Sequence, residues 1–307
     1  MNPDRRRALR VLAGTGAAAA TAVAAPPAHA ARAPKQAPPE AMGMLYDTTR
    51  CIGCKACVTA CSVANDMRPD RSPDGLHLMP VDLGGKTKNV IKLYKEGEKV
   101  SFMKSQCMHC VDPACASACM LHSLHKNETT GIVEYDPQYC VGCRYCQMSC
   151  PFNVAKFEFD KAVPKIVKCE LCRHRVGEAK LEKDGDFSRY SRGHGPACCE
   201  VCPRGAVIYG KRDELLAEAK RRLAENPAAY VPQVYGETEA GGTQVLYLSH
   251  VPFEKIGLPA YGPQGVPTTA YTIQEGLYKG FIAPVVLYGA LGAVLWRNRK
   301  QGGEVKP

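Results

Sequence analysis

The sequence predicts an α+β fold built from two pseudo-symmetric modules, and three observations lead to this architecture. All 17 cysteines lie between Cys51 and Cys202 in a chain of 307 residues. A motif that runs from Tyr46 to Cys57 recurs from Tyr135 to Cys146, and its residues match at one constant offset. Short stretches of strand type precede and follow the cysteine-rich loops. A repeat of this kind indicates two copies of one supersecondary unit that form a single body.

Sixteen of the cysteines sort by their spacing into four groups, which we call quartets one to four. Quartets one and three read C-x2-C-x2-C-x3-C, quartet two reads C-x2-C-x4-C-x3-C, and quartet four is split into a C-x2-C pair and a C-x3-C pair. In chain order the quartets are Cys51, Cys54, Cys57 and Cys61; Cys107, Cys110, Cys115 and Cys119; Cys140, Cys143, Cys146 and Cys150; and Cys169, Cys172, Cys198 and Cys202.

The spacing of quartets one and three is typical of a loop that binds a [4Fe–4S] cube. Three thiolates on one tight loop hold three irons, and the fourth cysteine points away. In two-cluster ferredoxins this fourth cysteine binds the other cluster, so such motifs work in pairs. The sequence therefore predicts four [4Fe–4S] clusters in two ferredoxin-like modules that hold two clusters each.

Two other cysteine chemistries fit the pattern less well. Structural zinc needs two C-x2-C pairs for each ion and has no use for a C-x2-C-x2-C-x3-C run. Disulfide frameworks suit short secreted chains, and cysteines that are two residues apart rarely bridge with good geometry.

The first 30 residues are predicted to be a twin-arginine export signal. Asp4–Arg10 carries the paired arginines, Val11–Ala25 is a weakly apolar stretch too short to span a membrane, and Ala28–Ala30 is a cleavage motif. An uncleaved anchor or a disordered tail is the alternative. Twin-arginine export carries folded proteins, so clusters can be assembled in the cytoplasm before translocation. Residues 31–42, which are rich in proline, follow as a linker.

Residues 43–250 are expected to form the body that carries the four quartets. Strands that end at Tyr46 and Tyr135 would lead into the loops of quartets one and three. Return strands are expected at Ala206–Ile208 and Ser123–Leu124, and short helices would carry the last cysteine of each loop.

Two insertions and one helix complete the predicted body. Residues 62–106 contain alternating stretches at Val90–Tyr94 and Val100–Lys104, which predict a hairpin. Residues 173–197 are charged and are expected to be a loop, either a docking element or a plain solvated loop. A helix is expected from a cap at Asp213 to Glu225, where Asn-Pro follows.

The C-terminal part is predicted to cross the membrane once, as a transmembrane helix over 277–297. After an extended linker over 251–276, residues 277–297 form an apolar run in which Lys279 lies near one end and can snorkel. Basic residues begin at Arg297, so the positive-inside rule places the tail over 298–307 in the cytoplasm. A buried core helix is the alternative.

The formal net charge of +10 has a simpler explanation than nucleic-acid binding. The predicted leader contributes four arginines and one aspartate, so its removal leaves a charge of +7. Four oxidised cubes with their thiolates would add about −8. The basic excess is therefore expected to compensate buried cluster charge, and no nucleic-acid partner is predicted.

Together these motifs resemble the four-cluster iron–sulfur subunits of membrane oxidoreductases, the family that contains the β subunits of DMSO reductase and formate dehydrogenase. Within this family the chain is most similar to the iron–sulfur subunit of a periplasmic, quinone-linked [NiFe] hydrogenase. The motifs that carry the resemblance, besides the leader and the C-terminal run, are Gly43-Met44-Leu45-Tyr46-Asp47, Gln106-Cys107-Met108-His109-Cys110-Val111-Asp112-Pro113, Gly142-Cys143-Arg144-Tyr145-Cys146, Lys168-Cys169-Glu170-Leu171-Cys172 and Gly241-Gly242-Thr243-Gln244-Val245-Leu246.

The resemblance implies how the cysteines are shared between clusters. In that family quartets one and four form one cluster pair, and quartets two and three form the other. The implied ligands are Cys51, Cys54, Cys57 and Cys202 for cluster one; Cys61, Cys169, Cys172 and Cys198 for cluster two; Cys107, Cys110, Cys115 and Cys150 for cluster three; and Cys119, Cys140, Cys143 and Cys146 for cluster four. Cys199 beside Cys198 leaves the closing ligand ambiguous, and Cys198 is preferred because it keeps the C-x3-C spacing to Cys202.

The implied function is electron transfer, with no catalytic residue in this chain. Electrons would pass from the small subunit of a [NiFe] hydrogenase, which works with its large subunit, to a multi-span membrane subunit that reacts with quinone. The protein would then lie at the inner membrane on the periplasmic side. Lys55, Arg144 and Lys168 are adjacent to ligands and could raise local potentials, or could be plain surface cations.

Two other functions are to be weighed against this one. The nearer is the β subunit of a periplasmic molybdenum or tungsten enzyme such as formate dehydrogenase, although the chain's own leader and its tail from Val251 favour hydrogenase. The more distant is a metal-stapled scaffold without redox function that only bridges partners to the membrane. Bound iron, bound sulfide and a reducible chromophore would separate the scaffold from both electron-transfer proteins.

Overall fold

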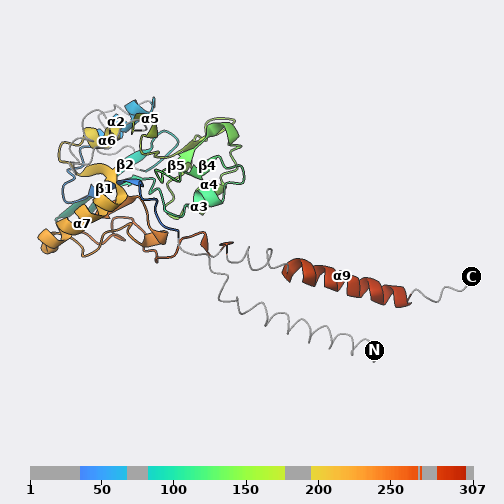
Figure 1. Cartoon of the computed structure of the whole chain (residues 1–307). Coiled ribbons are helices and arrows are strands. Elements are labelled where there is room, and N and C mark those ends of the chain that lie inside the picture. Colours follow the sequence, from blue (N-terminus) through green and yellow to red (C-terminus); the bar gives the residue numbers. More distant parts are fainter. Residues whose placement is uncertain (1–34, 68–81, 177–194, 269, 272–281, 302–307) are drawn as a thin grey trace, which may run out of the picture. The chain divides into compact units, whose positions relative to one another are not determined.

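The computed structural model describes residues 35–67, 82–176, 195–268, 270–271 and 282–301 (Figure 1). The predicted export signal over 1–30 and the first part of the predicted linker lie outside these residues. The chain divides into two units, of which one spans Pro34–Pro267 and contains every cysteine. The other unit includes the C-terminal helix and is treated separately below.

A three-stranded sheet supports quartets one and four. Its central strand β1 (Met42–Asp47) pairs antiparallel with β8 (Val207–Lys211) and parallel with β9 (Val245–Leu248). Side chains alternate along the sheet, so Met44 and Tyr46 join a core that includes the cysteines, whereas Leu45 joins a core on the other face. The sheet therefore has one face toward the quartets.

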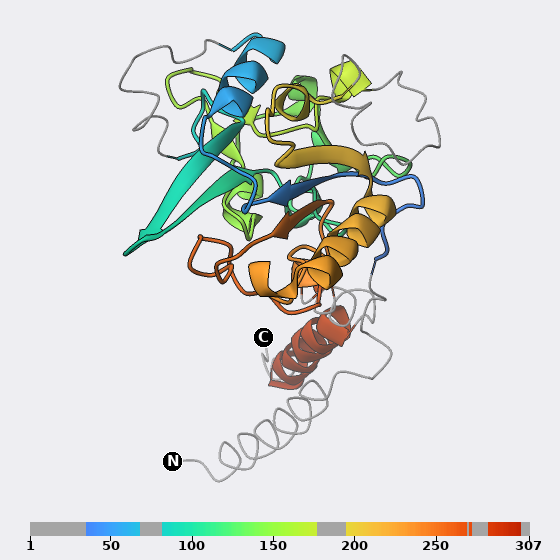
Figure 2. The ribbon, with the colours of Figure 1, turned by 90° about the vertical axis from the view of Figure 1, so that its left-hand side faces the viewer.

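Helix α7 (Arg212–Glu225) covers the other face of this sheet (Figure 2). Leu215 and Ala219 are fully buried there. The predicted helix is confirmed, but its predicted cap is wrong: the helix begins at Arg212 after Lys211, and Asp213 lies in the first turn. An acidic residue in that turn still stabilises the positive end of the helix dipole.

The second half of the body is built on two-stranded sheets. Strand β4 (Leu124–Lys126) pairs with β5 (Val133–Tyr135), and β6 (Lys156–Phe157) pairs with β7 (Ile166–Val167), both antiparallel. Leu124, Val133 and Phe157 form a small core with Cys146. The predicted strands before and after the cysteine loops are therefore present in both halves.

The internal repeat is visible in the backbone. In each copy a strand that ends near the tyrosine, β1 or β5, pairs antiparallel with a return strand, β8 or β4. The aspartate that follows the tyrosine accepts a hydrogen bond from the N–H two residues later, Asp47 from Thr49 at 3.0 Å and Asp136 from Gln138 at 2.9 Å. These turns redirect the chain from the strand into the cysteine loop.

Short helices carry several cysteines, but the expectation that a helix holds the last cysteine of each loop is confirmed only for Cys61. Cys119, Cys150 and Cys202 follow the ends of their helices. Cys57 and Cys61 lie in the first, Cys146 in the third and Cys198 in the last of the following helices: α2 (Ala56–Ala64), α3 (Ala114–Ser117), α4 (Tyr145–Ser149), α5 (Arg173–Val176) and α6 (Ala197–Glu200). Single 3-10 turns occur at Pro137–Tyr139, Pro227–Ala229 and Glu239–Gly241.

The predicted hairpin is confirmed and is longer than expected. Strand β2 (Asn89–Glu96) pairs with β3 (Lys99–Gln106) through a tight turn in which Gly97 has a φ of 59°. Its base is buried and its tip is exposed (Figure 2). Most of the predicted charged loop over 173–197 lies outside the described residues.

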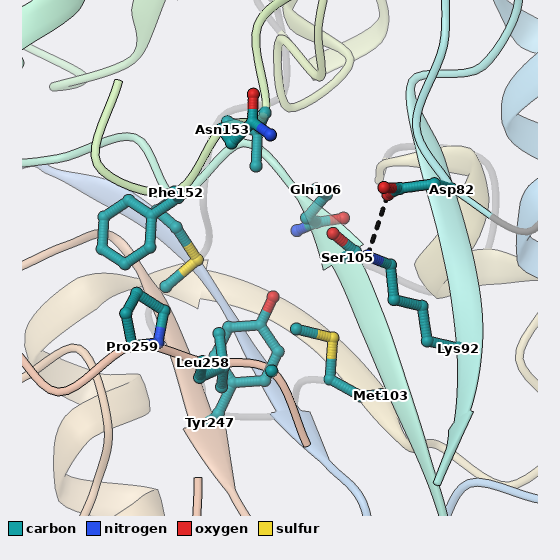
Figure 3. A pocket seen from close by; sticks show the side chains of 13 residues that line it. Asp82, Lys92, Met103, Ser105, Gln106, Phe152, Asn153, Tyr247, Leu258 and Pro259 are labelled. Atoms are coloured by element: carbon teal, nitrogen blue, oxygen red, sulfur yellow. Dashed lines mark ion pairs between the residues drawn. The ribbon is translucent and has the colours of Figure 1, made fainter. Parts of the chain in front are cut away.

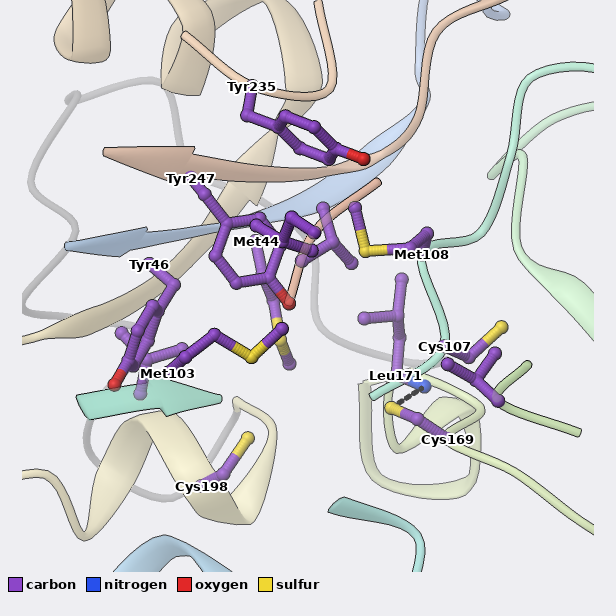
Figure 4. Close-up of a cluster of buried hydrophobic side chains, with 14 of the residues drawn as sticks. Met44, Tyr46, Met103, Cys107, Met108, Cys169, Leu171, Cys198, Tyr235 and Tyr247 are labelled. Carbon is purple, nitrogen blue, oxygen red and sulfur yellow. Dashed lines mark hydrogen bonds between the residues drawn. The ribbon is translucent and has the colours of Figure 1, made fainter. Parts of the chain in front are cut away.

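The segment around β9, residues 234–258, contacts both halves of the body. Gln244 accepts a backbone bond from Met44 at 3.0 Å, and its own N–H donates to Met108 at 3.1 Å. The rings of Tyr46, Tyr235 and Tyr247 meet edge to face at this place (Figure 4). One segment thus links the sheet of the first half to the loop of quartet two.

The C-terminal unit contains helix α9 (Ile282–Gln301). The predicted membrane span over 277–297 begins in residues that are not described, and the described part of it is helical. No helix within the described part of the chain is both long and apolar enough to cross a membrane.

Candidate functional site

All four C-x2-C loops share one backbone feature. The residue before the second cysteine has a left-handed conformation in each loop: φ is 71° at Gly53, 48° at His109, 71° at Gly142 and 51° at Leu171. Glycine adopts this conformation at little cost, and two loops use it. This left-handed conformation points backbone N–H groups toward the sulfur of the first cysteine. For example, the N–H of Gly53 donates to Cys51 Sγ at 3.4 Å. Such N–H donors stabilise a thiolate.

The first candidate site is a cavity lined by four cysteines. Cys51, Cys54 and Cys57 of quartet one line it together with Cys202 of quartet four. The N–H of Ala206 donates to Cys202 Sγ at 3.3 Å. Ile91 and Val207 add apolar walls, two basic side chains lie at the cavity, and no acidic side chain lines it. A dry, cationic pocket with four thiols suits an anionic iron–sulfur cluster.

The second candidate site also combines quartets one and four. Here quartet one supplies only its last cysteine, and quartet four supplies the others. Helix α2, which carries Cys61, packs against α6, which carries Cys198. Burial raises the pKa of the Cys61 thiol, and the neighbouring thiols of Cys169, Cys198 and Cys172 raise it further. The last cysteine of quartet one therefore lies among the cysteines of quartet four.

Quartets two and three are interleaved in the same way. Helix α3 packs against α4. Burial raises the pKa of Cys115 to about 12, with the thiol of Cys150 from quartet three as the largest charge effect. Burial likewise raises the pKa of Cys146 to about 12, and the thiol of Cys119 from quartet two contributes. Each quartet thus sends its last cysteine toward its partner quartet.

The sulfur neighbours of Cys198 and Cys199 differ. Both side chains are buried and hydrogen-bonded to each other, and this bond lowers the pKa of Cys198. Cys198 lies near Cys57 and Cys61, whereas Cys199 lies near Cys172 and Cys198. Both thiols remain within reach of the second candidate site.

Two buried lysines accompany the cysteines. Lys104 in β3 has only 1% of its surface exposed, and nothing in the cysteine motifs points to it. Burial opposes its charge, but the thiols of Cys198 and Cys57, with others, outweigh this effect and raise the pKa of Lys104. Lys168, for which the sequence allowed a surface position, is buried with 3% exposed. Burial raises the pKa of Cys107, and the positive charge of Lys168 opposes that rise.

The two candidate cluster pairs approach each other where quartet two meets quartet four. Figure 4 shows Cys107, Cys169 and Leu171 side by side, with the N–H of Leu171 donating to Cys169 Sγ at 3.4 Å. Lys168 donates to the carbonyl oxygen of Cys169 at 3.1 Å. His109 is fully buried here, and its Nδ1 accepts from the N–H of Val133 at 3.0 Å. Clusters two and three would be neighbours at this junction.

A second cavity has a different character. Its volume is about 70 Å³, and the side chains that line it include no cysteine (Figure 3). Lys92 and Asp82 form an ion pair of 2.8 Å at this cavity. Its size and polarity suit ordered water. Among the described residues, no three His, Cys, Asp or Glu side chains converge on a point where one metal ion could bind.

Comparison with known proteins agrees with the cysteine sites. Two models described as a 4Fe-4S dicluster domain match residues 43–120 and 98–187. The chain is 40% identical over 304 residues to the hydrogenase-2 operon protein HybA of Escherichia coli O157:H7, which covers 89% of both chains. It is 35% identical over 213 residues to the nitrate-inducible formate dehydrogenase iron-sulfur subunit of Escherichia coli (strain K12), which covers 67% of both chains.

The fold and the thiol sites define an iron–sulfur protein of the ferredoxin type that holds [4Fe–4S] clusters and transfers electrons. The chain belongs to the family of iron–sulfur subunits that includes HybA and the formate dehydrogenase subunits.

Proposed function

We propose that this protein carries electrons through four [4Fe–4S] clusters from the small subunit of a periplasmic [NiFe] hydrogenase to an integral membrane subunit that reacts with quinone. Each cluster would supply one-electron redox chemistry when it is bound. The chain's own residues hold the clusters, exclude water from them and set the local charge. No residue of the chain is assigned a catalytic role.

The observation that carries this proposal is the exchange of last cysteines between quartets. Cys202 lies with quartet one and Cys61 with quartet four, while Cys150 lies with quartet two and Cys119 with quartet three. This exchange supports the sixteen ligands and four sites implied by the resemblance. It also brings the two clusters of each pair close together, as electron transfer requires.

The length of the similarity favours hydrogenase over formate dehydrogenase as the catalytic partner. The alignment with HybA covers 89% of the chain, whereas that with the formate dehydrogenase subunit covers 67%. The β subunit of a molybdenum or tungsten enzyme remains the second candidate. A scaffold without redox function is disfavoured, because a structural metal site does not need four-thiol sites whose cysteines are exchanged between quartets.

Location at the periplasmic side of the inner membrane is part of the same proposal. It is supported by the sequence of residues 1–30, which resembles a twin-arginine signal, and by the apolar run over 277–297. Neither the first segment nor the start of the second belongs to the described residues.

Two measurements test the proposed function. The anaerobically purified protein should contain about sixteen irons and show a reducible brown chromophore, whereas about eight irons or stoichiometric zinc would contradict four cubes.

Deletion of residues 277–307 should leave H2-dependent reduction of an artificial dye intact in membranes and should lower H2-dependent reduction of quinone. Unchanged quinone reduction would contradict the assignment of this segment to the electron-transfer complex.

A further inference from the structure

Lys104 lies among sulfur atoms that the proposal assigns to two different clusters. The thiols of Cys57, Cys61, Cys169 and Cys198 are the charges that act most strongly on it. Cys57 belongs to cluster one and the other three belong to cluster two. The lysine therefore lies near ligands of both clusters of the first pair, by which we mean clusters one and two.

The position of Lys104 is fixed by its surroundings. The ammonium group donates to Oε1 of Gln106, and Nε2 of Gln106 donates to the sulfur of Met44 at 3.2 Å. The carbonyl oxygen of Lys104 accepts from the hydroxyl of Tyr247 at 2.7 Å. All of these side chains are buried, so the cation cannot move away to solvent.

A buried cation without an acidic partner is costly unless anions compensate it. Among the described residues, the polar partner of the Lys104 ammonium group is the amide oxygen of Gln106 and not a carboxylate. Cluster-bound thiolates would supply the compensating charge, and that charge becomes more negative by one when a cluster gains an electron. A fixed cation nearby therefore favours the reduced state, and low polarity strengthens the effect.

We propose that Lys104 raises the reduction potentials of both clusters of the first pair. This inference rests on the proposed function, because it needs the clusters to be bound. Lys104 touches no reacting atom in this role and acts through its field alone. The second pair, clusters three and four, has its own buried cation, since Lys168 acts on Cys107 and Cys115 of cluster three.

The test is a redox titration followed by electron paramagnetic resonance on the complete protein with all clusters assembled. Lys104→Met, which keeps an unbranched apolar side chain but removes the charge, should lower the equilibrium constant for reduction of clusters one and two at least tenfold, or 59 mV for a one-electron couple. Lys104→Arg should stay near the wild type. Clusters three and four should not change.

Two matched variants show whether the effect is local. Lys95→Met removes an exposed cation from β2 of the same hairpin and should shift no cluster. Lys168→Met should lower the potentials of cluster three and of cluster two, whose ligand Cys169 accepts a bond from Lys168 at its carbonyl oxygen, and should spare cluster one. If Lys104→Met fails to retain its iron, Lys104→Gln replaces it in the titration.

The outcomes are distinct. An unshifted first pair, or an equal shift in Lys104→Met and Lys104→Arg, would show that packing and not charge matters and would overturn the inference. Loss of clusters in every neutral variant would also overturn it, because the cation would then serve assembly. A wild-type protein without four clusters would instead refute the proposed function.

Discussion

The half of the body that holds quartets one and four is supported differently from the half that holds quartets two and three. The first rests on a three-stranded sheet with α7 on its far face, and its aspartate, Asp47, is fully buried against Arg222. The second rests on short two-stranded sheets, and the equivalent Asp136 is partly exposed. The loops of quartets one and three are nearly the same in the two halves.

The two halves also differ in the exposed apolar side chains around their equivalent cysteine loops. Cys54 and Cys143 occupy equivalent places in the repeat, and both are exposed. Around Cys143 lie several exposed large apolar side chains, which are Tyr139, Val141, Tyr145 and Met148. Near Cys54, the exposed apolar side chains in the same stretch are Ile52 and Val63. The repeat therefore preserves the cluster loops, while supports and surfaces have diverged.

The largest expected effect tests which quartets are paired. Cys202→Ser should remove or convert cluster one, lowering the iron content from about sixteen toward about twelve, because three ligands on one loop hold a cube poorly. Cys150→Ser should do the same to cluster three. Iron analysis with paramagnetic resonance would show which signal is lost. Loss of a second-pair signal in Cys202→Ser would contradict the exchange of cysteines.

The second effect concerns the buried support of the first half. Asp47→Ala removes the carboxylate that NH1 of Arg222 reaches at 3.1 Å, while Glu218 still pairs with this buried guanidinium at 2.7 Å, and should cost about 1.5–3 kcal/mol of unfolding free energy. Asp136→Ala removes only a capping bond, at about 1 kcal/mol. Urea unfolding of the cluster-loaded protein, followed by circular dichroism, measures both. Equal losses would mean that the two supports do not differ.

The third effect distinguishes the two glycines of the repeat. A Cβ on Gly53 would lie 2.3 Å from the ring of Phe102, whereas a Cβ on Gly142 would lie 3.3 Å from Pro164. Both positions have a φ of 71°, so both alanine variants carry the same backbone strain. Gly53→Ala should therefore be about 1–3 kcal/mol less stable than Gly142→Ala in the same unfolding assay. Adding Phe102→Leu should recover part of that difference.

The smallest effect concerns the tyrosines that precede each loop. Both hydroxyls are hydrogen-bonded to the first thiol, Tyr46 to Cys51 and Tyr135 to Cys140. Tyr46 donates its proton to the carbonyl oxygen of Phe102 at 2.9 Å, whereas Tyr135 accepts from the N–H of Ile166 at 3.3 Å. The proton of Tyr135 is thus available to the sulfur.

We therefore expect Tyr135→Phe to lower the potential of cluster four by less than about 59 mV, and Tyr46→Phe to lower that of cluster one by less still. Redox titration of both variants measures the difference. A larger shift for Tyr46→Phe would reverse the assigned direction of these hydrogen bonds.

Local spacing made much of this molecule predictable. The cysteine quartets, the repeat, the hairpin and α7 depend on residues that are close in sequence, so their patterns can be recognised directly. The expected cap at Asp213 was wrong because several polar residues stand at the start of α7, and propensity alone does not choose among them.

Contacts between distant residues were not predictable in this way. The ion pair of Asp47 and Arg222 joins positions 175 residues apart. Lys104 looked like an ordinary lysine at the end of a hairpin strand, and only the packing of that strand against quartets one and four brings it to the sulfur atoms. The parallel pairing of β9 with β1 likewise follows no local signal.

The segment around β9 also bears on the order of events during biosynthesis. Residues 234–258 are made after every cysteine of both halves, and they supply bonds to β1 and to the loop of quartet two. Until that stretch leaves the ribosome, the two halves lack this connection. We therefore expect iron insertion to precede closure, so that a chain stalled before residue 234 would accept iron but expose the faces that β9 later joins.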